Sequence, residues 1–136
     1  MDGAVDFSTL QLTEKPNQYL VCPAGECGGQ AHMASPVFEV PVAALKDAWS
    51  HMLANQPRIE VLGEDSETNQ IVVVQRSKLM HFPDTVTVAF VPLGEKRSTL
   101  YVYSRSTYGY SDLGVNAERI QAWLAALAAD PAVAKK

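Results

Sequence analysis

The chain has 136 residues, of which 47% are hydrophobic and 19% are charged, and its formal net charge is −4. This length predicts one soluble domain that folds without metals, and the negative charge gives no indication of a nucleic-acid or anionic-membrane partner. No apolar run approaches the roughly 18 residues of a membrane-spanning helix, and the first residues lack the basic start and apolar core of a signal peptide.

The N-terminal part shows little regular periodicity. Residues 1–18 predict an extended lead-in to a single domain at 19–130, and residues 131–136 predict a flexible tail. Within the domain, residues 19–21 predict a short edge strand, and the glycine- and alanine-rich residues 24–35 predict a loop.

Cys22 and Cys27 are the two cysteines of the chain, and a glycine lies between them. This spacing suits a small disulfide loop in an oxidising compartment. Two reduced thiols are one alternative. A metal site that adds His32 is another, although it lacks a second ligand pair at the usual spacing.

Two segments have the periodicity of amphipathic helices. The first begins at residue 41 or 42 and ends by residues 55–57, where a proline restricts the preceding residue. The second begins with Asn116 as its N-cap, and Val115 and Ile120 have the spacing of a hydrophobic staple.

Four strand-like runs lie between these helices, at residues 58–62, 70–77, 84–91 and 99–105. Short polar connections predict that they pair antiparallel. Alternation in the last run puts Leu100, Val102 and Ser104 on one face and Tyr101, Tyr103 and Arg105 on the other. The order predicts an α+β two-layer sandwich, with an antiparallel four- to five-stranded sheet and two helices packed on one face.

The stretch from Tyr103 to Arg119 joins the last strand to the second helix. Arg105 and Arg119 lie in this stretch, and Arg76 lies at the end of an earlier strand. If the three arginines converge beside the helix N-terminus, they would form a binding site for a carboxylate or phosphate. The alternative is structural pairing, in which the anion is the protein's own Asp84 or Asp112. The predicted ligand-binding residues are Arg76, Arg105, Arg119, Asn116, Ser104, Ser106, Tyr103 and Tyr110.

Serine chemistry is a weaker interpretation of the same corner. A Ser–His–Asp set can be assembled on paper from His81, Asp84 and a nearby serine. However, residues 109–114 do not form the Gly-x-Ser-x-Gly elbow, and the parallel-sheet pattern around such an elbow is missing. The candidate serines are Ser77, Ser104, Ser106 and Ser111.

Four sequence blocks together resemble the bacterial and plant family called domain of unknown function 1499, over residues of about 15 to 127. They are Lys-Pro-Asn-Gln-Tyr-Leu-Val at 15–21, Val-Gln-Arg-Ser at 74–77, Phe-Pro-Asp at 82–84, and Tyr-Ser-Arg-Ser with Gly-Tyr-Ser-Asp-Leu-Gly-Val-Asn and Arg at 103–119. Many members have Pro-Asn-Cys near the start, where this chain has Gln18 as the third residue. The resemblance implies no established activity. Members often carry a membrane anchor or export leader ahead of the domain, so the resemblance implies a periplasmic or membrane-anchored location in the cell envelope, with a leader or anchor in the full-length precursor.

We therefore expect a non-enzymatic, envelope-associated domain without a cofactor. It would bind a small anionic or amphipathic ligand, or a partner protein, at residues 103–119. A serine-dependent hydrolase at the same corner and a purely structural assembly module are the alternatives.

Overall fold

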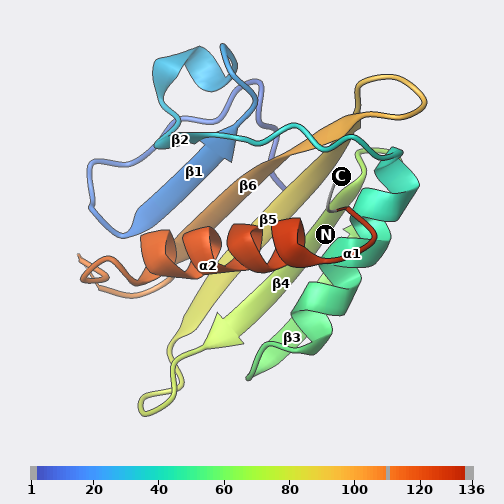
Figure 1. Cartoon of the computed structure of the whole chain (residues 1–136). Coiled ribbons are helices and arrows are strands. Elements are labelled where there is room, and N and C mark those ends of the chain that lie inside the picture. Colours follow the sequence, from blue (N-terminus) through green and yellow to red (C-terminus); the bar gives the residue numbers. More distant parts are fainter. Residues whose placement is uncertain (1–2, 110, 134–136) are drawn as a thin grey trace.

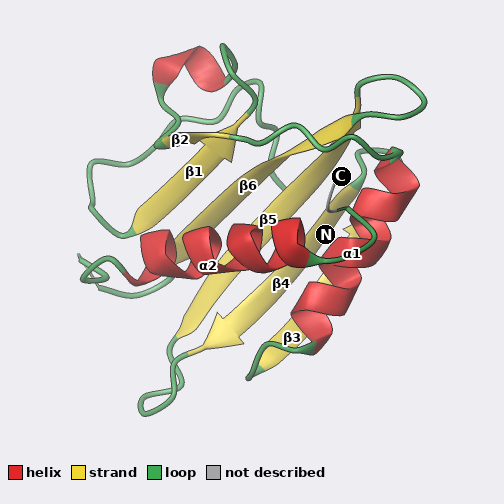
Figure 2. Ribbon diagram, viewed as in Figure 1, coloured by secondary structure: helices red, strands yellow, loops and turns green. Residues whose placement is uncertain are grey.

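A computed structural model describes residues 3–109 and 111–133 and shows an α+β fold (Figure 1). Both helices cross the same face of one sheet (Figure 2). The elements in chain order are β1 (Gln18–Cys22), the short 3-10 helix η1 (Cys27–Gly29), β2 (Met33–Ala34), α1 (Val42–Ala54), β3 (Ile59–Asp65), β4 (Gln70–Arg76), β5 (Pro83–Pro92), β6 (Ser98–Ser106) and α2 (Val115–Ala129).

The sheet has six strands in the order β2-β1-β6-β5-β4-β3. β1 and β2 are parallel, and every other neighbouring pair is antiparallel. The predicted α+β class is confirmed, but the sheet is mixed and has one strand more than the upper prediction. The missed strand, β2, has two residues within the predicted loop, too few to show the alternation that marks a strand. Its presence makes β1 an interior strand.

The main core lies between the sheet and the helices. Alternate residues of β1, β4, β5 and β6 face the apolar stripes of α1 and α2, so the period of two in the strands meets the period of 3.6 in the helices. Trp49 of α1 lies edge-on to Trp123 of α2, with ring centroids 5.9 Å apart. Val133 is also buried in this core, so packing continues into the predicted tail as far as that residue.

A smaller core covers the other face of the sheet. Phe7 from the lead-in is buried there against Leu20, Cys22, Ala89 and Tyr103 of the sheet and its edge loop, with further apolar lead-in residues around it. Residues 3–17 form no helix or strand, yet they form a partial third layer. The two faces of β6 are therefore covered by different parts of the chain.

Candidate functional site

Arg119 is the centre of a buried polar network on the helix face. Its guanidinium lies 2.8 Å from the Asp84 carboxylate, and it donates to Gln75 Oε1 at 2.6 Å and to Asn116 Oδ1 at 2.7 Å. The Arg119 side chain is 8% exposed and that of Asp84 is 14% exposed. The anion that pairs with Arg119 is thus the protein's own Asp84, and the charge of this arginine is compensated internally.

Asn116 connects three elements and does not act as the helix N-cap. It is fully buried, and its Oδ1 accepts a hydrogen bond from Ser104 Oγ at 2.6 Å. Its Nδ2 donates to the Asn17 carbonyl, to Ser106 Oγ and to Asp112 Oδ2, at 3.1, 2.9 and 2.7 Å. Asn116 therefore ties the start of α2 to the end of β6 and to the segment that leads into β1.

The cap of α2 is supplied by Asp112. Its carboxylate accepts hydrogen bonds from the N–H groups of Gly114 at 2.8 Å and Asn116 at 3.1 Å. Gly114 occupies the N-cap position at φ 83°, which glycine tolerates without steric cost. The predicted Asn116 cap was wrong by two residues. A hydrophobic staple requires an apolar residue immediately before the N-cap. Val115 follows the N-cap as the first helical residue, and its side chain is 45% exposed, so the predicted staple with Ile120 does not form.

Opposing effects act on the Asp112 carboxyl. Its burial works to raise the pKa, whereas hydrogen bonds from the Asn116 side chain and from two backbone N–H groups favour the charged form. The hydrogen bonds outweigh the burial and leave the pKa of Asp112 below its ordinary value. The charge on Asp112 therefore stabilises the helix start.

Arg105 lies on the opposite face of the sheet from Arg119. It donates to Thr87 Oγ1 at 2.9 Å and to the carbonyls of Tyr103 and Gly3 at 3.2 and 3.1 Å. Its guanidinium carbon lies 4.7 Å from the centre of the Tyr103 ring. All three acceptors are neutral, and among residues 3–109 and 111–133 no carboxylate oxygen lies within 4.0 Å of Arg105.

Burial affects the titration of both groups in this pair. It lowers the pKa of Arg105, and the negative charge of an ionised Tyr103 acts in the other direction. Burial likewise raises the pKa of the Tyr103 hydroxyl, against the effect of Arg105. At neutral pH, Arg105 is therefore a partly buried cation and the Tyr103 hydroxyl is neutral.

A cavity of about 240 Å³ lies beside Arg105, and we call it the Arg105 cavity. Two of its lining residues are cationic, no lining residue is acidic, and the others carry hydroxyl or amide groups. The lining residues are Thr13, Lys15, Asn17, Gln18, Tyr103, Arg105, Ser106 and Thr107.

The predicted convergence of Arg76, Arg105 and Arg119 does not occur. Arg76 is 46% exposed, donates to the His81 carbonyl at 3.2 Å and lies 4.0 Å from Glu60. Arg76 and Arg119 both line a cleft of about 430 Å³ at one end of the sheet. Arg105 points to the opposite face of the sheet from Arg119. The physical reason is the alternation in β6: the helices cover the Leu100 face, and Arg105 belongs to the opposite one.

The candidate serines are used in local hydrogen bonds. Ser104 Oγ is buried and donates to Asn116, while Ser77 Oγ accepts from the Phe82 N–H at 3.0 Å and Ser111 Oγ from the Leu113 N–H at 3.2 Å. Within the described part of the chain, no histidine side chain is hydrogen-bonded to any of them. Tyr110, a predicted ligand-binding residue, lies outside the described residues.

Cys22 and Cys27 form a disulfide. His32, which the metal alternative needed, accepts a hydrogen bond from the Leu20 N–H at Nδ1, 2.9 Å away, and its ring stacks on Tyr19. The two sulfurs are thus joined to each other, and His32 supports the strand beside them.

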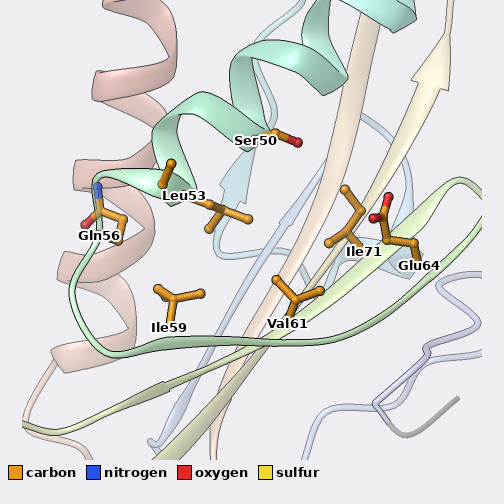
Figure 3. A pocket seen from close by; sticks show the side chains of 8 residues that line it. Ser50, Leu53, Gln56, Ile59, Val61, Glu64 and Ile71 are labelled. Carbon is orange, nitrogen blue, oxygen red and sulfur yellow. The ribbon is translucent and has the colours of Figure 1, made fainter.

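An apolar hollow in the structure was not predicted from the sequence. It has a volume of about 370 Å³ and lies between the C-terminal half of α1 and β3 (Figure 3). Leu53, Ile59, Val61 and Ile71 point into it, and Glu64 is its one charged lining residue (Figure 3). It depends on how β3 curves past α1, which periodicity does not reveal. The polar side chains of the hollow are one acid and two neutral groups, Ser50 and Gln56, whereas the Arg105 cavity has two cationic residues among several hydroxyl and amide groups, so the Arg105 cavity is the stronger candidate for specific binding of an anion.

The comparisons with known proteins agree with the family resemblance, and the matched range contains all four sequence blocks. A family model described as a protein of unknown function (DUF1499) matches residues 10–127. Neither curated proteins nor solved structures gave a significant match. Within the described residues, neither helix combines the length and apolar character needed to cross a membrane. Since the family match covers most of its length, the chain belongs to the DUF1499 family.

Proposed function

We propose that this domain is an envelope-associated binding module that holds a small anion of the phosphate or carboxylate class in the Arg105 cavity. The observation that carries the proposal is the partly buried Arg105 guanidinium, which has neutral acceptors and no carboxylate partner among the described residues. The envelope location rests on the family resemblance.

No carboxylate in the described part of the chain balances the positive charge of Arg105. Moving a cation out of water is costly unless an anion or a full set of hydrogen bonds offsets the loss of hydration. A guanidinium has five N–H donors, and neighbouring residues accept three hydrogen bonds from Arg105. A bound oxyanion would accept from the remaining donors and would supply the missing negative charge.

The lining of the Arg105 cavity fits this role. Lys15 provides a second positive charge, and the Thr107 hydroxyl is a donor for a further oxyanion oxygen. Drug-sized ligands occupy pockets of about 300–1,000 Å³, so a cavity of about 240 Å³ suits a smaller molecule. The expected ligands are therefore inorganic phosphate, a small phosphomonoester or a small carboxylate.

Isothermal titration calorimetry with phosphate, methyl phosphate, acetate and succinate tests the proposal and separates its phosphate and carboxylate forms. We expect saturable binding of at least one class. In Arg105→Gln the affinity for that anion should fall by about ten- to a hundredfold, since hydrogen bonds to charged groups contribute about 1.5–3 kcal/mol. Lys15→Ala should weaken binding by up to about fivefold, because an exposed charge pair contributes about 1 kcal/mol or less.

Lys96→Ala is the matched control. It removes the same charge from an exposed lysine in the loop at the other end of β5 and β6, far from the Arg105 cavity, and we expect no effect on binding. Melting temperatures are a less specific measure of binding, because phosphate raises them by being excluded from protein surfaces. A rise in melting temperature that is equal in wild type and Arg105→Gln therefore does not count as binding. Absence of saturable binding for every anion, or unchanged affinity in Arg105→Gln, would overturn the proposal.

A further inference from the structure

Large apolar side chains are exposed at one end of the sheet, on the tips of two loops. Leu79 and Met80 lie at the tip of the β4–β5 loop, and Leu113 lies in the β6–α2 loop. Leu79 is 84% exposed and Leu113 is 91% exposed. We call the whole set the loop-tip patch, which comprises Leu79, Met80, Phe82, Tyr108, Leu113 and Val115.

The two loops lie side by side. The rings of Phe82 and Tyr108 are 6.0 Å apart between centroids, and the Thr107 N–H donates to the Pro83 carbonyl at 3.3 Å. The strand register agrees, because the last residue of β6, Ser106, is paired with Asp84 at the start of β5. Both loops extend from the same end of the sheet (Figure 1).

Folding does not account for these apolar residues. Hairpin loops are ordinarily built from Gly, Pro, Asn, Asp and Ser, whereas this loop has Leu79 and Met80 at its tip with little contact to either core. Leu113 is held at φ 55°, a left-handed conformation in which leucine is uncommon and asparagine is tolerated. Exposed apolar clusters of this kind mark surfaces that bind something.

The charges beside the patch indicate what it binds. Arg58, Arg76 and Lys78 are exposed at this end of the sheet and line the adjoining cleft. Of the acidic residues there, Asp84 and Asp112 are engaged in internal hydrogen bonds, Glu60 lies near Arg76, and Glu118 borders the cleft. Three exposed basic side chains thus flank the apolar tips, and two of the four acidic side chains there are held in internal hydrogen bonds.

The other end of the sheet has a different character. The β3–β4 connection there carries Glu64, Asp65 and Glu67. The β5–β6 loop at the same end adds Glu95, Lys96 and Arg97, so this end is acidic on balance, whereas the charges at the loop-tip end nearly cancel. An anionic surface would repel the acidic end more than the loop-tip end, which would orient the molecule with its apolar loop tips forward.

We propose that the loop-tip patch inserts into the interfacial region of an anionic lipid bilayer, with Arg58, Arg76 and Lys78 against the headgroups. Aliphatic side chains on narrow loop tips can enter the acyl boundary, and the Phe82–Tyr108 pair behind them suits the headgroup level. Flanking basic residues add attraction to acidic lipids. This inference does not depend on anion binding in the Arg105 cavity, because different residues carry it.

Co-sedimentation of the full chain with lipid vesicles tests the inference. The probes are vesicles of phosphatidylcholine alone and vesicles containing one-third phosphatidylglycerol. We expect binding to the anionic vesicles that weakens as salt is added, because salt screens exposed charges. The double variant Leu79→Ser with Leu113→Asn should bind at least about tenfold more weakly, because it removes two large apolar groups from the inserted tips.

Two matched measurements keep the result interpretable. Both substituted residues are exposed, so the melting temperature of the double variant should not fall, and Leu113→Asn relieves an unfavourable backbone conformation. Leu93→Ser makes the same change on the exposed β5–β6 loop at the other end of the sheet and should leave vesicle binding unchanged.

A fluorescent reporter adds independent evidence. Trp49 and Trp123 are buried, so a tryptophan introduced as Leu79→Trp would report on the loop tip. Its emission should shift to shorter wavelength with anionic vesicles, and that of Leu93→Trp should not. The inference is overturned if the wild type does not bind anionic vesicles or if binding survives the double substitution. It is also overturned if the patch instead mediates a dimer that the double variant abolishes without any vesicle binding.

Discussion

The two faces of β6 place an arginine in opposite electrostatic situations. On the helix face, Arg119 reaches Ser104 and is paired with Asp84 at 2.8 Å within a buried network. On the other face, Arg105 is held by neutral oxygens and has no carboxylate partner in the described residues. An arginine in a motif is therefore a structural group or a candidate binding group according to whether the fold supplies its counter-ion.

The largest expected effect comes from breaking the compensated pair. Arg119→Met should lower the free energy of unfolding by about 3–5 kcal/mol, because it leaves the Asp84 carboxylate buried without its cation. Urea unfolding followed by the fluorescence of Trp49 and Trp123 measures this. Adding Asp84→Asn should recover much of the loss. A decrease below about 1 kcal/mol for Arg119→Met alone would contradict the assigned role.

Removal of the disulfide measures how much a cross-link on the other face of the sheet contributes to stability. Replacing Cys22 and Cys27 by serine should cost about 2 kcal/mol, because a cross-link around a loop of this size restricts the unfolded chain. Intact mass after alkylation without reductant gives a direct check on the bond. No added groups are expected, and two added groups would show that the cysteines are free.

The cap of α2 should have a smaller effect, on the helix face. Asp112→Ala should cost about 1 kcal/mol, since it removes the acceptor for two N–H groups at the helix start. Urea midpoints compared with those of wild type at neutral pH measure the loss. Equal midpoints would show that the helix start does not depend on this carboxylate.

The same carboxyl predicts a pH dependence. Because the pKa of Asp112 is lower in the folded state, its contribution is complete above the unfolded value of about 3.9 and is lost as the pH falls through the folded value. Asp112→Asn should therefore lose less stability than wild type when the pH is lowered from 5 to below 3. Parallel loss in the two proteins would contradict this.

Arg105 should give the smallest effect and the sharpest contrast. In buffer without oxyanions, Arg105→Met should change the free energy of unfolding by less than about 1 kcal/mol, because the lost hydrogen bonds are offset by no longer burying a cation that has no carboxylate partner among the described residues. Urea unfolding beside Arg119→Met makes the comparison directly. Equal destabilisation of the two variants would show that Arg105 is a structural residue and would remove the support for an anion site.

Most elements were predictable because their signals are local. The strand at 70–76 is a β-branched run, and the α1 stripe repeats at helical spacing. The cap of α2 was not, because Asp112 and Asn116 are both good capping residues and lie near each other in the sequence. The choice between them depends on Ser104 and Asn17, which hold the Asn116 side chain in the interior.

The candidate site was predictable only in part. The stretch from Tyr103 to Arg119 was predicted either to bind an external anion or to pair its arginines with Asp84 or Asp112, and Arg119 is paired with Asp84. The alternation in β6 already separated Ser104 from Arg105. The signal that could have ruled out convergence was the apolar Leu100–Val102 face, since the helices must cover it and Arg105 must then point away.

The sequence by itself determined the element types, the family and the two faces of each strand, because periodicity and turn chemistry act over a few residues. Only the tertiary structure decided which arginine meets a carboxylate, since Asp84 and Arg119 are far apart in the chain and are joined by the packing of α2 on β5 and β6. It also brought two distant loops together as one exposed apolar patch. Contacts between segments remote in sequence arise from packing, which no local pattern encodes.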